Sequence, residues 1–168
     1  MFTFIPEYYF EKFSDATPEF LLSIGVKGIV LDIDNTLEPY EHPRAGEHVL
    51  SWFTALKAAG IKTAIVSNNN EDRVSTFNED LNIPAYSKAG KPFKKKVICA
   101  INDMGIEREV AILMGDQVFT DVWAAHNAGI PAILVPPIND RKDLLTKFKR
   151  ILEKPIIYKK KNTQSIGE

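Results

Sequence analysis

The chain has 168 residues, of which 45% are hydrophobic and 26% charged, and its formal net charge at pH 7 is -1. This length suits one domain with a substantial core, and the near-neutral charge gives no reason to expect a nucleic-acid-binding protein. The single cysteine, Cys99, excludes an internal disulfide and a zinc site built from cysteines, which fits a reducing compartment.

The sequence carries no targeting or membrane-spanning signal. Its N-terminus lacks the basic region and apolar core of a secretory signal peptide, and no apolar run approaches the roughly eighteen residues of a membrane span. We therefore expect a cytoplasmic protein whose contact with a membrane is limited to its surface.

The predicted elements alternate between strands and helices. Helices are marked by apolar residues at helical spacing, by N-cap and proline signals at their start, and by glycines at their end. Strands are marked by short apolar runs rich in Ile and Val. In chain order the sequence predicts a helix from Thr17 that ends at Gly25, a strand over 28–33, a polar segment over 38–44, a helix over 46–59, a strand over 62–66, a helix over 71–81, an extended piece over 84–87, a helix over 93–104, a strand over 110–114, a helix over 119–128, a strand over 131–135 and a helix over 140–153.

This alternation indicates a parallel sheet that is covered by helices on both faces. The N-terminal segment is rich in aromatic side chains, and we expect it to cover the sheet rather than to dock on a membrane. Its aromatic residues are Phe2, Phe4, Tyr8, Tyr9, Phe10 and Phe13.

The most informative segment is the end of the first strand, where Asp32 and Asp34 follow the apolar run 28–31. Residues two apart on a strand point to the same side, so both carboxylates are expected at one spot on the carboxyl edge of the sheet. Buried charges are costly unless they are paired or hold a metal. The pair therefore indicates a magnesium site, a nucleophile beside an acid/base group, or both.

Polar groups follow three later segments as well, and parallel strands align their carboxyl ends, so all of these groups are expected to converge in one crevice. Four motifs occur in order: Asp32-Ile-Asp34-Asn-Thr36, Val66-Ser67-Asn68, Lys91-Pro92 and Gly115-Asp116-Gln-Val-Phe-Thr120-Asp121. With these motifs, over about 28–135, the sequence resembles the haloacid dehalogenase (HAD) phosphohydrolase superfamily.

The resemblance implies a single α/β domain over 1–168, in which a Rossmann-like parallel sheet is flanked by helices. Its core would span about 28–135 and its basic C-terminal part 140–168. The sequence is more narrowly similar to a short bacterial subgroup of class IIIA phosphatases, through Ser-Asn-Asn-Asn after the second strand and Gly-Asp-Gln-Val-Phe-Thr-Asp after a later one. That subgroup is related to phosphatidylglycerophosphate phosphatases.

The resemblance also implies a role for each site residue. Asp32 would attack phosphorus and form an aspartyl-phosphate, and Asp34 would protonate the leaving alcohol and then activate water. The remaining implied roles are phosphate binding by Ser67, Asn68 and Lys91, Mg²⁺ binding by Asp32, Asp34 (through its backbone carbonyl), Asp116 and Asp121, and support of the loop by Thr36.

The spacing of the motifs bears on the substrate, because members of this superfamily often carry a cap domain between them. Asp32 and Ser67 are 35 positions apart, and Ser67 and Lys91 are 24 apart, which leaves no room for a cap domain. We therefore expect an open site, unless a second subunit covers it. Phosphatidylglycerophosphate is the first expected substrate, and a soluble sugar or nucleotide phosphate is the second. A binding or assembly protein on a phosphatase fold is the third reading.

The charge is unevenly distributed, since residues 141–161 contain nine Lys and Arg side chains and two acids. A helix over 140–153 would carry apolar side chains on one face and basic ones on much of the rest, as helices at anionic membrane surfaces do. Packing of the apolar stripe on the domain is the stronger expectation. The expected partners are a phosphorylated substrate, with an anionic lipid head group as one form of it, and a membrane contacted peripherally on its inner face.

The three histidines carry no evident chemistry. His42 lies in the polar segment near the site and is expected to be exposed, whereas His48 and His126 fall on helices where nothing in the sequence pairs them. We therefore assign them no role.

Overall fold

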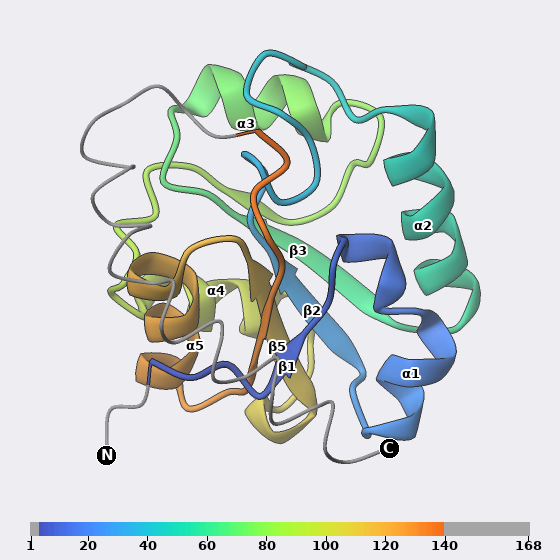
Figure 1. Ribbon diagram of the computed structural model, residues 1–168, viewed down its shortest axis with the longest axis vertical. Coiled ribbons are helices and arrows are strands. Elements are labelled where there is room, and N and C mark those ends of the chain that lie inside the picture. Colours follow the sequence, from blue (N-terminus) through green and yellow to red (C-terminus); the bar gives the residue numbers. More distant parts are fainter. Residues whose placement is uncertain (1–3, 140–168) are drawn as a thin grey trace.

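The structure, a computed structural model, describes residues 4–139, which form one parallel sheet with helices on both faces (Figure 1). The strands are β1 (Tyr8–Tyr9), β2 (Gly28–Leu31), β3 (Lys62–Val66), β4 (Ala85–Tyr86), β5 (Ala111–Gly115) and β6 (Ala132–Leu134). The α-helices are α1 (Pro18–Ser23), α2 (Glu47–Ala58), α3 (Glu71–Asn78), α4 (Lys95–Asp103) and α5 (Trp123–Ala128). Two short 3₁₀ turns, η1 (Phe13–Asp15) and η2 (Arg108–Val110), and a π-helical turn, η3 (Val118–Val122), complete the described elements.

The strand order β1-β6-β5-β2-β3-β4 places β2 in the middle of the sheet. Every pairing is parallel, so all strands end at the same edge. The chain runs from β2 outward to β3 and β4, and it then returns to add β5 on the other side of β2. In open α/β sheets, ligands bind outside the carboxyl ends of the strands at such a reversal. The topology therefore places Asp32 and Asp34, which follow β2, at the expected binding position.

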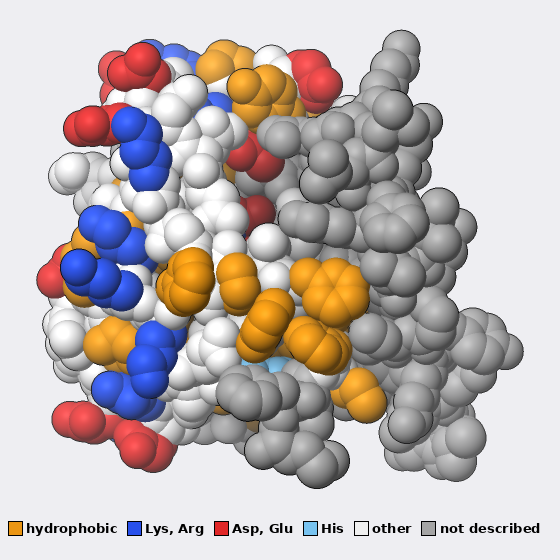
Figure 2. Space-filling model, turned by 90° about the vertical axis from the view of Figure 1, so that its left-hand side faces the viewer, with side chains coloured by type: hydrophobic (Ala, Val, Ile, Leu, Met, Phe, Trp, Pro, Cys, Tyr) orange, Lys and Arg blue, Asp and Glu red, His pale blue; other side chains and the backbone are white. Residues whose placement is uncertain are grey.

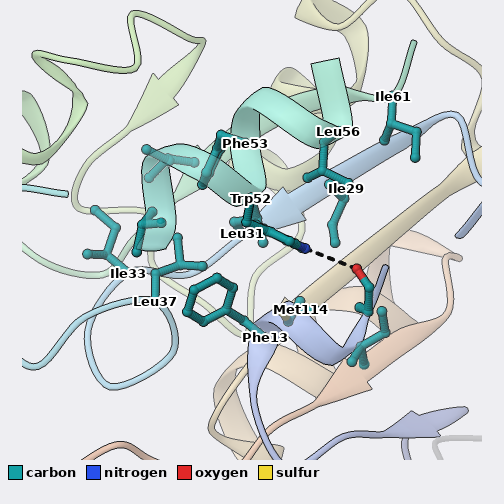
Figure 3. Packing of buried hydrophobic residues seen from close by; sticks show 14 of the residues in the cluster. Phe13, Ile29, Leu31, Ile33, Leu37, Trp52, Phe53, Leu56, Ile61 and Met114 are labelled. Carbon is teal, nitrogen blue, oxygen red and sulfur yellow. Dashed lines mark hydrogen bonds between the residues drawn. The ribbon is translucent and has the colours of Figure 1, made fainter. Parts of the chain in front are cut away.

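Alternate residues of β2 face two separate apolar cores. On one face, Ile29 and Leu31 pack with side chains of α1, α2 and α3 (Figure 3). Trp52 of α2 lies in this core, and its Nε1 donates a hydrogen bond of 3.1 Å to the carbonyl of Ala16, which satisfies its polar atom. On the other face, Val30 packs with α4 and α5. Burial of each such side chain contributes about 1.5–3 kcal/mol, so the strand that carries the aspartates is firmly held.

Two sequence-based expectations need correction. The aromatic N-terminus does not simply cover the sheet, because Tyr8 and Tyr9 form a sixth strand that pairs with β6. The helix expected over 119–128 begins as the π-helical turn η3 before it becomes α5. The helix expected over 140–153 lies outside the described residues.

Within residues 4–139, no cap domain interrupts the fold. The connection from β2 to β3 contains a loop and α2, and the connection from β3 to α4 contains only α3 and β4. This agrees with the motif spacing, and no domain formed by the described residues covers the carboxyl edge of the sheet.

Candidate active site

A pocket of about 260 Å³ opens at the carboxyl ends of the central strands. Figure 2, which shows the side of the molecule that carries α4 and α5, reveals acidic side chains at the bottom of a hollow. All four motifs contribute residues to the lining, and Tyr40 and Asn69 join them from outside the motifs. The lining residues are Asp32, Asp34, Asn35, Tyr40, Ser67, Asn68, Asn69, Lys91, Gln117, Thr120 and Asp121.

Lys91 lies between two aspartates of this pocket. Its Nζ donates to Oδ1 of Asp32 over 2.8 Å and to Oδ1 of Asp121 over 2.6 Å. All three side chains are at least nine-tenths buried. Removing a charge from water costs several kcal/mol, and only close pairing and hydrogen bonds offset that cost. The double contact made by Lys91 therefore compensates both carboxylates.

Burial and neighbouring charges shift the pKa values of Asp32 and Lys91. Burial raises the pKa of Asp32 to about 6, an effect that Lys91 opposes and that the charges of Asp121 and Asp34 reinforce. Burial alone would lower the pKa of Lys91, but the carboxylates of Asp121 and Asp32 outweigh burial and raise it above its ordinary value. The ammonium of Lys91 is thus stabilised in its charged form by the two aspartates that it contacts.

Asp116 completes a buried acidic cluster. One carboxylate oxygen from each of Asp32, Asp116 and Asp121 lies within 4.8 Å of the others. Thr36 contacts the cluster, since its Oγ1 donates to Oδ1 of Asp116 over 3.3 Å. The cluster thus brings three carboxyl groups together around the ammonium of Lys91. Carboxylate oxygens are the ligands that hard divalent cations prefer, so both the charge and the donor set fit such an ion.

The backbone around Gly115 positions Asp121. A Cβ atom at Gly115 would stand 2.2 Å from Cγ of Asp121, so glycine is required for this close approach. The backbone N–H of Gln117 donates to Oδ2 of Asp121 over 3.0 Å. The π-helical turn η3 contains Asp121, and such turns are frequent at functional sites.

Asp34 is bound by different residues. Nε of Arg73 donates to its Oδ1 over 3.0 Å, and Nδ2 of Asn69 donates to its Oδ2 over 2.8 Å. Asp32 therefore faces Lys91 whereas Asp34 faces Arg73. Two carboxylates in different environments can take different roles, such as nucleophile and acid/base group.

Ser67 and Asn68 both line the pocket but differ in their contacts. Oδ1 of Asn68 accepts from the backbone N–H of Lys91 over 2.8 Å, and its Nδ2 donates to the backbone carbonyl of Lys91 over 3.2 Å. The side chain of Asn68 therefore fixes the backbone of Lys91. Oγ of Ser67 accepts from the N–H of Asn69 over 3.1 Å, and a hydroxyl that accepts one bond still has a proton to donate.

Arg73 was not found by sequence reasoning. Its side chain reaches Asp34 across 39 positions in the chain, and it lies in the first turn of α3, outside every motif. Tyr40 also lines the pocket from outside the motifs, whereas Gln117 and Thr120, which line it too, lie within the fourth motif but were assigned no role. No local sequence signal identifies such contacts, because they arise only when the loops fold together.

The histidines have partners that the sequence did not reveal. Nδ1 of His42 and Nε2 of His48 lie 3.1 and 3.4 Å from the carboxylate oxygens of the buried Glu38. Nε2 of His126 lies 3.2 Å from Oε2 of Glu7. The expectation that His48 and His126 are unpaired is therefore wrong, whereas His42 is exposed as expected.

Comparisons with known proteins agree with this fold. Residues 26–135 match the family model described as haloacid dehalogenase-like hydrolase. The chain is 40% identical to the "probable phosphatase YqeG" of Bacillus subtilis (strain 168) over 154 residues. This alignment covers 92% of this chain and 90% of that protein.

Two solved structures share the fold. CbbY from Rhodobacter sphaeroides, in complex with phosphate, has a TM-score of 0.57 at 13% identity, covering 70% of this chain and 89% of its own. The cobalt-bound deoxy-D-mannose-octulosonate 8-phosphate phosphatase (YrbI) from Haemophilus influenzae has a TM-score of 0.52 at 15% identity, covering 68% and 80%. From the family match and the 40% identical relative, the chain belongs to the haloacid dehalogenase-like hydrolase family.

Proposed function

We propose that this hydrolase is a Mg²⁺-dependent phosphatase of phosphomonoesters that acts through an aspartyl-phosphate. One observation carries the proposal: two carboxylates, Asp32 and Asp34, line one open pocket with Lys91 and stand in different environments. The family and the relative named as a probable phosphatase support the same reaction class. Class IIIA membership is part of the proposal and rests on the motifs.

The chain's own residues account for both steps. In the first step an oxygen of Asp32 forms a bond to phosphorus, the bond from phosphorus to the ester oxygen breaks, and Asp34 donates a proton to the departing alkoxide. In the second step Asp34 takes a proton from water, the water oxygen attacks phosphorus, and inorganic phosphate leaves Asp32. Lys91 and Ser67 would bind the phosphoryl oxygens, and Asn68 would keep Lys91 in place through its backbone.

The proposed Mg²⁺ ligands are the carboxylates of Asp32, Asp116 and Asp121 and the backbone carbonyl of Asp34. The first three form the buried cluster, in which one oxygen of each lies within 4.8 Å of the others. When bound, the ion would neutralise negative charge on the cluster and on the phosphoryl oxygens. Thr36 would orient Asp116 through their hydrogen bond.

For the substrate we propose phosphatidylglycerophosphate, an anionic lipid whose phosphorylated head group would enter the pocket. Two exposed aromatic residues support an amphiphilic substrate. Tyr40 lines the pocket and is 47% exposed, and Phe93, two residues after Lys91 in the chain, is 75% exposed. Lys94 and Lys95 follow Phe93 and are exposed as well. Figure 2 shows hydrophobic side chains below the hollow and basic ones beside them. A basic residue near an anionic membrane contributes about 1 kcal/mol of attraction.

In the described part of the chain, no helix is long and apolar enough to cross a bilayer. A lipid substrate would therefore be reached by peripheral contact, and we propose the inner face of the membrane as the place of action. Co-sedimentation with vesicles of phosphatidylglycerol and phosphatidylcholine tests this. Absence of binding to the anionic vesicles would favour the second candidate, a soluble sugar or nucleotide phosphate.

Phosphate release measures the function directly. The substrates are p-nitrophenyl phosphate and phosphatidylglycerophosphate in mixed micelles, with Mg²⁺ or with EDTA. Asp32→Asn is the test variant, and Asp72→Asn, which changes an exposed aspartate on α3, is the matched control. We expect release that needs Mg²⁺, disappears in Asp32→Asn and persists in Asp72→Asn, with a strong preference for the lipid. No release from either ester by the folded wild type would contradict the proposal.

A further inference from the structure

We infer that Arg73 is a positioning residue for proton transfer by Asp34, an inference that rests on the proposed function. The guanidinium group fixes the plane of the Asp34 carboxylate, so that this group meets the leaving oxygen in one orientation. Arg73 lies outside every motif, and its contacts in the structure are the observations that point to this role.

The contacts form a two-sided clamp on Asp34. Nε of Arg73 donates to Oδ1 over 3.0 Å, while Nδ2 of Asn69 donates to Oδ2 over 2.8 Å. Each oxygen thus accepts one bond from the protein. A carboxylate offers about four acceptor positions, so the clamp leaves a lone pair on each oxygen for a proton or a ligand. Asp34 lines the pocket, which makes those lone pairs available to a substrate there.

Arg73 is itself held in place. Its backbone N–H donates to the N-cap side chain Asn70 over 2.9 Å, which fixes the start of α3. Its guanidinium lies 5.5 Å from the ring centroid of Phe77, and its Nη1 donates to the carbonyl of Pro43 over 2.7 Å. The side chain is only 8% exposed. An arginine constrained on these sides can hold a carboxylate with little rotational freedom.

The clamp is costly to the protein, which argues against an incidental contact. Asp34 is 13% exposed and Arg73 is 8% exposed, so both charges are largely desolvated. Nη2 of Arg73 is buried without a hydrogen-bond partner, which costs about 1–3 kcal/mol. Apolar residues often replace buried ion pairs without loss of stability. The position of this costly pair beside the proposed nucleophile therefore points to a role in the reaction.

The competing explanation is that Arg73 only ties the loop after β2 to α3, through its bond to Pro43. The chain supplies a matched control for this reading. Arg44 neighbours Pro43 and ties the same loop to Glu79 and Asp80, just after α3, but it does not touch Asp34. If Arg73 only ties the loop to α3, Arg44→Met should change the activity on the two esters in the same way as Arg73→Met. If Arg73 orients Asp34 for proton transfer, only Arg73→Met should lose activity selectively on the alkyl phosphate.

The test uses leaving groups of different quality. The p-nitrophenolate ion departs without protonation, whereas an alkoxide needs a proton from a general acid. We would measure kcat/KM, which reports the step that expels the leaving group, for p-nitrophenyl phosphate and for the alkyl phosphate that the wild type hydrolyses fastest. The proteins are wild type, Arg73→Met, Arg73→Lys and Arg44→Met, with Tm measured for each.

We expect Arg73→Met to lower kcat/KM by about 100-fold on the alkyl phosphate and by less than about 10-fold on p-nitrophenyl phosphate, as for a weakened general acid. Arg73→Lys, which keeps the charge but loses the planar guanidinium, should recover part of the alkyl activity. If Arg73→Met does not fold, the ratio for Arg73→Lys decides in the same way.

Equal losses on the two esters, or the same selective loss in Arg44→Met, would overturn the inference and leave a structural role. Unchanged alkyl activity in Arg73→Met would overturn it as well. A wild type that is inactive on both esters, or an active Asp32→Asn, would instead remove the proposed function and the inference with it. The failures of the two claims are therefore distinguishable.

Discussion

Replacement of Lys91 by methionine should destabilise the fold strongly. Methionine keeps a long apolar side chain at this position but removes the ammonium group, which contacts Asp32 at 2.8 Å and Asp121 at 2.6 Å. The Lys91 side chain is 2% exposed, so water does not replace it. Removing one partner of a buried ion pair costs about 3–5 kcal/mol. Because two carboxylates lose their cation here, the upper half of that range is expected, out of a total stability of about 5–15 kcal/mol.

The assay is urea unfolding at pH 8 without Mg²⁺, compared with wild type and with Lys95→Met. Lys95 lies exposed in the first turn of α4, where a positive charge meets the positive end of the helix dipole, so its loss should change the free energy of unfolding by at most about 0.5 kcal/mol. A Lys91→Met protein within about 0.5 kcal/mol of wild type would refute the reasoning, since the buried carboxylates would then not depend on Lys91.

The loss should also depend on pH. Burial already raises the pKa of Asp32 above its unfolded value, and loss of the ammonium group removes the charge that opposes this shift. The folded variant therefore binds a proton at Asp32 more tightly than the unfolded chain does. The free energy of unfolding of Lys91→Met should therefore rise as pH falls from 8 to 5. A deficit that is constant over this range would contradict the charge argument.

Three further outcomes follow from the geometry. Gly115→Ala should abolish phosphate release, because the new Cβ would displace Asp121, whereas the control Asp72→Asn should stay active. A Gly115→Ala protein that is stable and active would contradict this. Burial raises the pKa of Asp32 from its ordinary value of 3.8 to about 6. The contribution of protonated Asp32 to stability is therefore fully present below pH 3.8 and is lost as pH rises through about 6. In urea titrations without Mg²⁺, the wild type should lose stability relative to Asp32→Asn between these two pH values. Burial alone would raise the pKa of Glu7, but hydrogen bonds from His126 and Ala132 outweigh burial and lower it. Because this side chain is 42% exposed and solvent screens its charge, Glu7→Gln should cost at most about 0.5 kcal/mol at pH 7, and the difference from wild type should vanish as pH falls through the lowered pKa.

The fold was largely predictable because its signals are local. Apolar runs such as that before Asp32 mark buried parallel strands, and cap residues such as Thr17, whose Oγ1 accepts from the N–H of Phe20, mark helix starts. β1 was missed because two residues, Tyr8 and Tyr9, are too few to show any period. Only its pairing with β6 makes this segment a strand.

The motifs located the pocket but not its internal contacts. Asp32 and Lys91 were both singled out, yet their ion pair joins positions 59 apart and depends on the packed loops. Asn68, expected to bind phosphate, uses its amide on the backbone of Lys91. The clamp of Arg73 on Asp34 has no local signature at all. Sequence patterns therefore indicated that the motif residues converge, while their individual contacts were set by tertiary structure.

The central claim is that Asp32 carries the phosphoryl group during turnover. It is tested by rapid acid quench of the wild type with Mg²⁺ and a phosphomonoester, followed by mass spectrometry of the peptide that contains residue 32. The account predicts one phosphoryl group on Asp32, which alkali removes and which is absent from Asp32→Asn. Phosphate release by an enzyme that never carries a phosphoryl group on this peptide, or undiminished release by Asp32→Asn, would contradict it.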